Sequence, residues 1–215
     1  MQEHHLSVTR TARYFTMGAS GDEVREVWFV LHGYGQLAAF FIRHFKPLDE
    51  GHRLFVAPEG LSRFYLQNGL GRVGATWMTR EDRLHEIDDY VRYLDDLYDT
   101  ILASGIPDEV TVHLLAFSQG CATATRWAGL GKARFDRVTL WAGEIAHDLD
   151  LDAHGEPLRQ ADVTLVVGTE DEYINADRLA KAQAHLDAHA IGHRLLTFPG
   201  PHRLDAATLQ ELASG

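Results

Sequence analysis

Six short apolar runs, separated by longer segments, constrain the fold of this chain more than any other feature. They are EVWFVLHG (26–33), RLFVAPEG (53–60), VTVHLLAFS (110–118), RVTLWAG (137–143), VTLVVGTED (163–171) and HRLLTFPG (193–200). Several are almost continuously apolar, which is typical of strands in a parallel sheet covered by helices on both faces. The pattern predicts an α/β fold with a mostly parallel central sheet.

Helical patterns occupy the intervals between these runs. The clearest spans residues 81–104, where apolar side chains recur every three or four positions: Leu84, Ile87, Val91, Leu94, Tyr98 and Ile101. Weaker patterns cover residues 36–46, 119–130, 176–190 and 204–213.

Two further segments complete the organisation of the chain. Residues 7–17 are joined to the first run by a link too short for a crossover helix, so we expect them to pair antiparallel at an edge of the sheet. Residues 61–77, LSRFYLQNGLGRVGATW, support no firm element, and the loop 59–80 that contains them is expected to limit access to the functional site.

Length, charge and cysteine content limit the classes of function. A chain of 215 residues suits one α/β domain, residues 1–215, without a lid domain. Its net charge of −11 disfavours nucleic acid and anionic membranes as partners, and no apolar run is long enough for a membrane span. Because Cys121 is the only cysteine, no intramolecular disulfide can form, and we expect a cytoplasmic protein. The sequence leaves a homodimer open.

Ser118 occupies a position suited to a nucleophile. The motif AFSQG places it directly after an apolar run and before a helical pattern, with the small residues Ala116 and Gly120 two positions away on either side. This is the context in which a serine is held on a strained turn with its hydroxyl exposed. A serine that simply caps a helix is the alternative interpretation of the motif alone.

An acid and a histidine follow Ser118 in the order that a Ser-acid-His arrangement requires. Asp171 comes at the end of the run 163–171, and His202 follows the last run on a loop rich in glycine and proline. Glu170 competes for the role of acid, but Asp171 is better placed. Among the other histidines, His32 is interpreted as a brace for its loop, while His4 and His5 lack the spacing of metal ligands.

Two backbone amides are candidate donors for an oxyanion, which acyl transfer requires. The amide of Gln119 follows the candidate nucleophile directly. The loop HGYGQ after the first run supplies the second candidate, the amide of Tyr34, because Gly33 and Gly35 allow the backbone to turn there.

With HGYG, AFSQG, GTEDEYI and GPHRLD in this order, the sequence resembles the phospholipase/carboxylesterase family of α/β-hydrolases, over about residues 26–213. The resemblance implies an α/β-hydrolase fold, with Ser118 as nucleophile, Asp171 and His202 as its partners, and the amides of Tyr34 and Gln119 as oxyanion donors. The chain departs from the family pattern at Ala116, where glycine is usual, and at Pro201.

The expected function is hydrolysis of small carboxylic esters through an acyl-enzyme on Ser118, with neither cofactor nor metal. A thioesterase acting on acylated protein or other thioesters, a lysophospholipase and a non-catalytic binding protein are the alternatives. Apolar side chains near the ends of the runs are expected to line a pocket for an apolar acyl or alcohol group. These candidates are Phe64, Tyr65, Trp77, Met78, Trp141, Ile145 and Tyr173.

Overall fold

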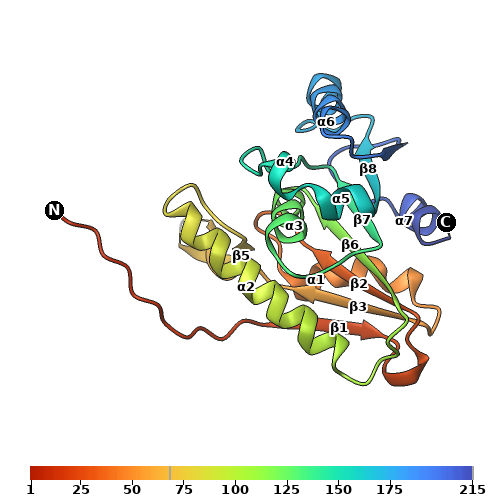
Figure 1. The fold of residues 1–215 in the computed structure, drawn as a ribbon, viewed down its shortest axis with the longest axis horizontal. Helices are drawn as coiled ribbons and strands as arrows, with labels where there is room; N and C mark the ends of the chain where they lie inside the picture. The colour runs from red at the N-terminus through yellow and green to blue at the C-terminus, as the bar shows by residue number, and fades with distance from the viewer. Residues whose placement is uncertain (68, 215) are drawn as a thin grey trace.

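A computed structural model describes residues 1–67 and 69–214. Asn68, within the segment that supports no firm prediction, and Gly215, at the end of the predicted domain, lie outside the described residues. The main sheet has seven strands in the order β1-β3-β2-β6-β7-β8-β9, shown in Figure 1. Their bounds are β1 Tyr14–Gly18, β2 Glu26–Leu31, β3 Arg53–Pro58, β6 Thr111–Phe117, β7 Arg137–Trp141, β8 Asp162–Gly168 and β9 His193–Phe198.

The strand directions agree with the sequence-based prediction. Each of the six apolar runs forms one strand, and neighbouring strands pair in parallel throughout β3-β2-β6-β7-β8-β9. The exception is β1, which pairs antiparallel with β3 at the edge of the sheet. The ends of the parallel strands therefore meet along one edge, where ligands of such sheets bind.

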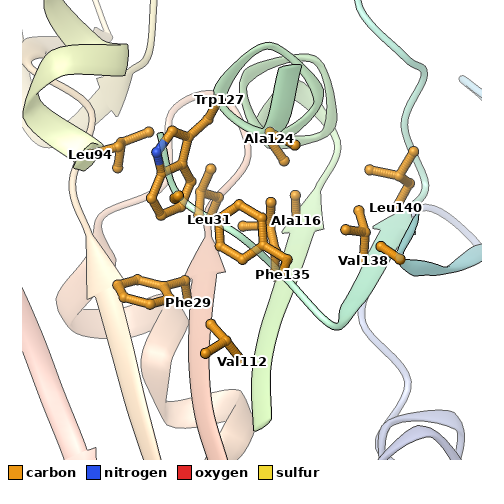
Figure 2. Packing of buried hydrophobic residues seen from close by; sticks show 14 of the residues in the cluster. Phe29, Leu31, Leu94, Val112, Ala116, Ala124, Trp127, Phe135, Val138 and Leu140 are labelled. Carbon is orange, nitrogen blue, oxygen red and sulfur yellow. The ribbon is translucent and has the colours of Figure 1, made fainter. Parts of the chain in front are cut away.

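Helices cover both faces of the sheet, which explains why the strands are apolar at consecutive positions. In β2, Phe29 and Leu31 point into one core, while Trp28 and Val30 point into the other. Figure 2 shows part of the first core, where Phe29 and Leu31 lie among side chains of neighbouring strands and of two helices. Because successive side chains enter different cores, the strand is apolar at every position. A strand with one face in solvent would alternate between apolar and polar residues.

The helices divide between these two cores. The first core receives side chains from α2 (Arg83–Leu102), α3 (Gln119–Leu130), α4 (Leu151–His154), α5 (Glu156–Gln160) and α6 (Ala176–Ala188). The second receives them from α1 (Ala38–Phe41), the 3-10 helix η2 (Ile42–Leu48) and α7 (Ala206–Ser214). A further 3-10 turn, η1, spans Gly21–Glu23. Of the helices in the described part of the chain, none combines the length and apolar character needed to cross a membrane.

Three features differ from the sequence-based predictions. The helix expected over 36–46 is a single α-turn that continues as the 3-10 helix η2, which contains Pro47. The short helices α4 and α5 were not predicted, because four or five residues are too few to show a helical period. The segment 61–77 is not irregular but forms an antiparallel pair, β4 (Ser62–Gln67) and β5 (Leu70–Thr76).

The β4-β5 pair packs against the loop after β2. The amide of Gly35 donates to the carbonyl of Ala75 at 2.8 Å, and the amide of Ala75 donates to the carbonyl of Gln36 at 3.0 Å. A Cβ atom on Gly74 would lie only 2.4 Å from the carbonyl oxygen of Gly35, so the two backbones approach as closely as glycine permits. This contact places the segment 61–77 beside the candidate oxyanion loop.

Candidate active site

Ser118 lies on a tight turn between β6 and α3. Its φ of 55° and ψ of −119° put a residue with a Cβ in a strained conformation, of the kind that functional sites retain. A Cβ at Gly120 would lie 2.8 Å from the carbonyl oxygen of Leu31 and 2.9 Å from that of His32. Gly120, two residues after Ser118, is therefore needed because α3 starts directly against the end of β2.

The turn brings Ser118 to the two residues predicted as its partners. His202 Nε2 is 2.9 Å from Ser118 Oγ, and His202 Nδ1 is 2.8 Å from Asp171 Oδ2. The three side chains follow β6, β8 and β9 and are separated by up to 84 residues along the chain. A carboxylate beside Nδ1 favours the tautomer with the proton on Nδ1, which leaves Nε2 free to accept the serine proton.

The carboxylate of Asp171 is held by its own loop. Its Oδ1 accepts the backbone N–H groups of Tyr173 and Ile174, both at 2.8 Å, so Oδ2 alone faces His202. The side chain has no exposed surface. Glu170, the competing acid, is exposed, and its backbone N–H donates to the carbonyl of Gly200 at 2.9 Å. The geometry thus favours Asp171 over Glu170 as the partner of the histidine.

Aromatic side chains hold the imidazole of His202 in place. Its ring lies 4.9 Å from that of Phe117 and 4.7 Å from that of Tyr173, measured between centroids. The indole N–H of Trp141 donates to the carbonyl of Arg203 at 2.8 Å, which fixes the loop that carries the histidine. The side chain of His202 keeps 14% of its surface exposed.

The two predicted oxyanion donors are backbone amides with no partner in the described residues. In the loop after β2, Gly33 N–H donates to Gln36 Oε1 at 2.8 Å, and Gln36 N–H donates to the carbonyl of Gly33 at 3.2 Å. The amide of Tyr34 makes no hydrogen bond within residues 1–67 and 69–214. Gln119 begins α3, so its N–H also has no helical acceptor and lies at the positive end of the helix.

The side chain of Gln119 has a role that the sequence did not suggest. Its Nε2 donates to Thr76 Oγ1 at 2.8 Å and to the carbonyl of Met78 at 3.0 Å. Its Oε1 accepts the amide of Trp77 at 3.3 Å. The residue next to Ser118 therefore ties the segment after β5 to the start of α3. No feature of the sequence pairs these positions, because they are more than 40 residues apart.

His32 acts as the brace that the sequence indicated. Its Nδ1–H donates to the carbonyl of Gly33 at 2.8 Å, and its Nε2 accepts the amide of Gly60 at 3.0 Å. Burial lowers the pKa of His32 from its ordinary value of 6.5, which keeps the ring neutral near pH 7. The indole N–H of Trp77 donates to the carbonyl of His32 at 2.8 Å and holds the same loop from the other side.

Glu59 is a second supporting residue that sequence reasoning missed. Its side chain has no exposed surface and accepts hydrogen bonds from Arg13 at 2.8 Å and Arg63 at 2.6 Å. It also accepts the amide of Ala38 at 3.2 Å, at the start of α1. Burial raises the pKa of Glu59, but the hydrogen bonds and charges of the two arginines outweigh it and hold the pKa below its ordinary 4.5. In the sequence, a single glutamate after a strand does not indicate that it will bind two arginines and a backbone amide.

The candidate pocket residues are only partly where the prediction placed them. Phe64 is half-buried, with its ring 5.1 Å from that of Tyr34 between centroids. Tyr65 is exposed and Met78 is half-buried. Trp77, Trp141 and Ile145 belong instead to the two cores, with exposures of 1%, 0% and 8%. The prediction was wrong for Trp77 and Trp141, because their large apolar surfaces pack inward and leave nothing for a ligand to contact.

A cavity of about 480 Å³ lies beside the candidate oxyanion loop. It extends from Gly35 to the start of α1, with apolar side chains at Leu37, Phe40, Phe41 and Val73. The sequence analysis did not select these residues, because the cavity forms only where β5 packs against the loop after β2.

Cys121 is not a competing nucleophile. It lies on α3 one turn from Ser118, is fully buried, and has its Sγ 3.2 Å from the carbonyl oxygen of Ala116. Burial raises the pKa of the thiol far above its ordinary value, so the reactive thiolate does not form near neutral pH.

A serine on a strand-to-helix turn, followed by an acid and a histidine at later strand ends, is the order in which α/β-hydrolases carry these residues. The chain has this fold. Residues 13–214 match the phospholipase/carboxylesterase family, and the chain belongs to that family of serine esterases. No curated protein sequence matches it.

Solved structures with the same fold include three esterases or thioesterases. Acyl-protein thioesterase 2 from Zea mays is 15% identical, with a TM-score of 0.71 over 95% of this chain and 97% of that chain. Esterase PE8 is 20% identical, with a TM-score of 0.72 over 95% and 97%. The Bacillus cereus carboxylesterase is 12% identical, with a TM-score of 0.71 over 94% and 92%. At these identities the likeness shows the fold alone.

Proposed function

We propose that this protein hydrolyses carboxylic esters through an acyl-enzyme formed on Ser118. The observation that carries the proposal is the continuous hydrogen-bonded chain from Ser118 Oγ through His202 to Asp171, with contacts of 2.9 and 2.8 Å. These distances are those at which a base accepts a proton from a nucleophile. Membership of a family of serine esterases supports the same reaction.

In the acylation step, His202 Nε2 accepts the proton of Ser118 as Oγ attacks the ester carbonyl carbon. The carbonyl oxygen becomes an oxyanion, which the amides of Tyr34 and Gln119 stabilise. Asp171 stabilises the imidazolium that forms on His202. The imidazolium then gives its Nε2 proton to the departing alkoxide, and the alcohol leaves an ester of Ser118.

In the deacylation step, water takes the place of the alcohol. His202 Nε2 accepts a proton from this water as its oxygen attacks the acyl-enzyme, and the same two amides hold the second oxyanion. The proton passes from His202 to Ser118 Oγ as the acid product leaves. The hydroxyl and the neutral imidazole are thereby restored.

We further propose that an apolar part of the substrate occupies the cavity beside Gly35. That cavity adjoins the loop that carries the Tyr34 amide. Leu37, Phe40 and Val73 give it an apolar part, beside the polar His44 and Arg72. Its volume of about 480 Å³ falls in the usual range for small ligands. The substrate class is thus a small ester with an apolar acyl or alcohol group.

Labelling with a fluorophosphonate probe tests the covalent step directly. The wild type and Ser104→Ala, which removes an exposed hydroxyl remote from the site, should label equally. Ser118→Ala should not label. Equal labelling of Ser118→Ala would exclude Ser118 as the nucleophile.

A series of p-nitrophenyl esters and matched thioesters tests the substrate class. Faster turnover of the thioesters would favour a thioesterase, whereas release of fatty acid from lysophospholipids alone would favour a lysophospholipase. No turnover of any of them would favour a non-catalytic binding protein. Val73→Trp should shift the preference towards shorter chains if the cavity holds the apolar group, and an unchanged preference would place that group elsewhere.

A further inference from the structure

A cluster of metal-binding side chains forms where the N-terminal segment meets the start of α2. His85 Nδ1 is 2.6 Å from Asp82 Oδ1, and His5 Nε2 is 3.3 Å from Asp82 Oδ2. The rings of His5 and His85 stack with their centroids 4.1 Å apart. Within residues 1–67 and 69–214, these three form the one group of histidine, cysteine and carboxylate ligands whose donor atoms all lie within 4.8 Å of one another.

We propose that His5, Asp82 and His85 bind a divalent transition-metal ion, with Zn²⁺ favoured over Mg²⁺ and Ca²⁺. Two imidazole nitrogens and a carboxylate oxygen are a donor set typical of zinc, whereas magnesium and calcium require mainly oxygen ligands. Glu3 lies beside this group, with its Oε1 3.3 Å from His5 Nε2, but it is not one of the three residues whose donor atoms all lie close together. The proposal is independent of the ester chemistry at Ser118.

The spacing of the donor atoms is close to that of a tetrahedral zinc site. With zinc bonds of about 2.0–2.1 Å, neighbouring ligand atoms stand about 3.3 Å apart. The donor atoms of His85 and Asp82 are 2.6 Å apart here, and those of all three residues lie within 4.8 Å of one another. The three side chains are about half exposed, so the surrounding packing leaves their torsions room to adjust.

Charge around the cluster favours a cation. Two more carboxylates, Asp88 and Asp89 on α2, line the same surface as the cluster. The contact of 2.6 Å between His85 and Asp82 requires a proton between two acceptors. A divalent ion would take the place of this hydrogen bond and bind the same two side chains.

The ligands come from segments far apart in the sequence, so an ion would fasten the N-terminal segment to α2. Figure 1 shows this segment leaving β1 as an extended chain. Further along it, Arg10 donates to the carbonyl of Leu61, and the carbonyl of Arg13 accepts the hydroxyl of Tyr93 at 3.0 Å. The histidine at position 5 carried no signal in the sequence because its partners are more than 75 residues away.

Titration calorimetry of the full, untagged chain with zinc chloride tests the site. We expect one ion per chain, with affinity at least about tenfold weaker in His5→Gln and in His85→Gln, since removing even a supporting partner costs about 10 to 100-fold. His4→Gln is the matched control, because it removes the neighbouring imidazole outside the cluster. His185→Gln is a second control. Its ring meets that of His189 edge to face at the end of α6, with centroids 4.7 Å apart, and this is the other close histidine pair in the described residues.

Either of two results overturns the proposal: no zinc binding by the wild type, or unchanged binding in His85→Gln. A loss of binding in His185→Gln but not in His85→Gln would place the ion on α6 instead. The cleavage rate by trypsin after Arg10 gives a second readout. Zinc should slow this cleavage in the wild type and not in His85→Gln, and zinc that binds without slowing it would contradict the fastening of the N-terminal segment.

Discussion

Replacing Asp171 by asparagine should abolish most turnover while leaving the fold intact. Oδ1 of Asp171 accepts two backbone N–H groups at 2.8 Å. The asparagine oxygen must stay at that position, because the reverse orientation would set its NH₂ against two buried donors at a cost of about 1–3 kcal/mol for each. The NH₂ group therefore faces His202 Nδ1, where the carboxylate oxygen stood at 2.8 Å.

This orientation forces the wrong tautomer on the imidazole. Nδ1 must accept from the asparagine, so the proton moves to Nε2, which can no longer accept the proton of Ser118. The same change in serine proteases lowers kcat about 10⁴-fold, which corresponds to about 5 kcal/mol of activation free energy, and we expect a loss of that size here. Because asparagine has the size of aspartate, the melting temperature should change little.

Turnover of a short p-nitrophenyl ester by purified variants measures the effect. Glu170→Gln is the matched control, since this neighbouring acid is exposed. It should retain wild-type turnover. A loss of less than about tenfold in Asp171→Asn, or an equal loss in Glu170→Gln, would refute the assignment of the acid.

Three other substitutions test the supporting structure. Gly120→Ala should lower the free energy of unfolding by about 1–3 kcal/mol, and with it the melting temperature and turnover, because its Cβ would meet two backbone carbonyls. Gly192→Ala, where a Cβ would have no atom within 4 Å, should change none of them. The free energy of unfolding should fall as the pH drops below about 4.5, because the lowered pKa of Glu59 stabilises the fold only while the carboxylate is charged; Glu59→Gln should make this fall less steep in acid titrations. Trp77→Phe should lower the free energy of unfolding by about 1–3 kcal/mol in denaturant titrations, since it leaves the carbonyl of His32 without its donor.

Prediction of the fold succeeded where an apolar run or a helical period is clear. The six apolar runs became the parallel strands, and α2 begins and ends within two residues of its predicted limits of 81–104. It failed for the segment 61–77, where β4 and β5 are largely exposed and β5 contains two glycines, Gly71 and Gly74. β5 lies outside the main sheet and pairs through Ala75 with the loop residues Gly35 and Gln36. No alternation of buried and exposed residues therefore marks it as a strand.

The sequence by itself determined the order of the site: a serine after one strand, an acid and a histidine after later strands, and glycines in the loop before them. This order follows from local chemistry, since strand ends and tight turns require particular residue types. Only the tertiary structure decided what surrounds these groups. It placed Trp77 and Trp141 in the cores and brought His5 to the start of α2. It also gave Gln119 and Glu59 their hydrogen bonds to distant segments. Such contacts depend on packing that no local pattern records.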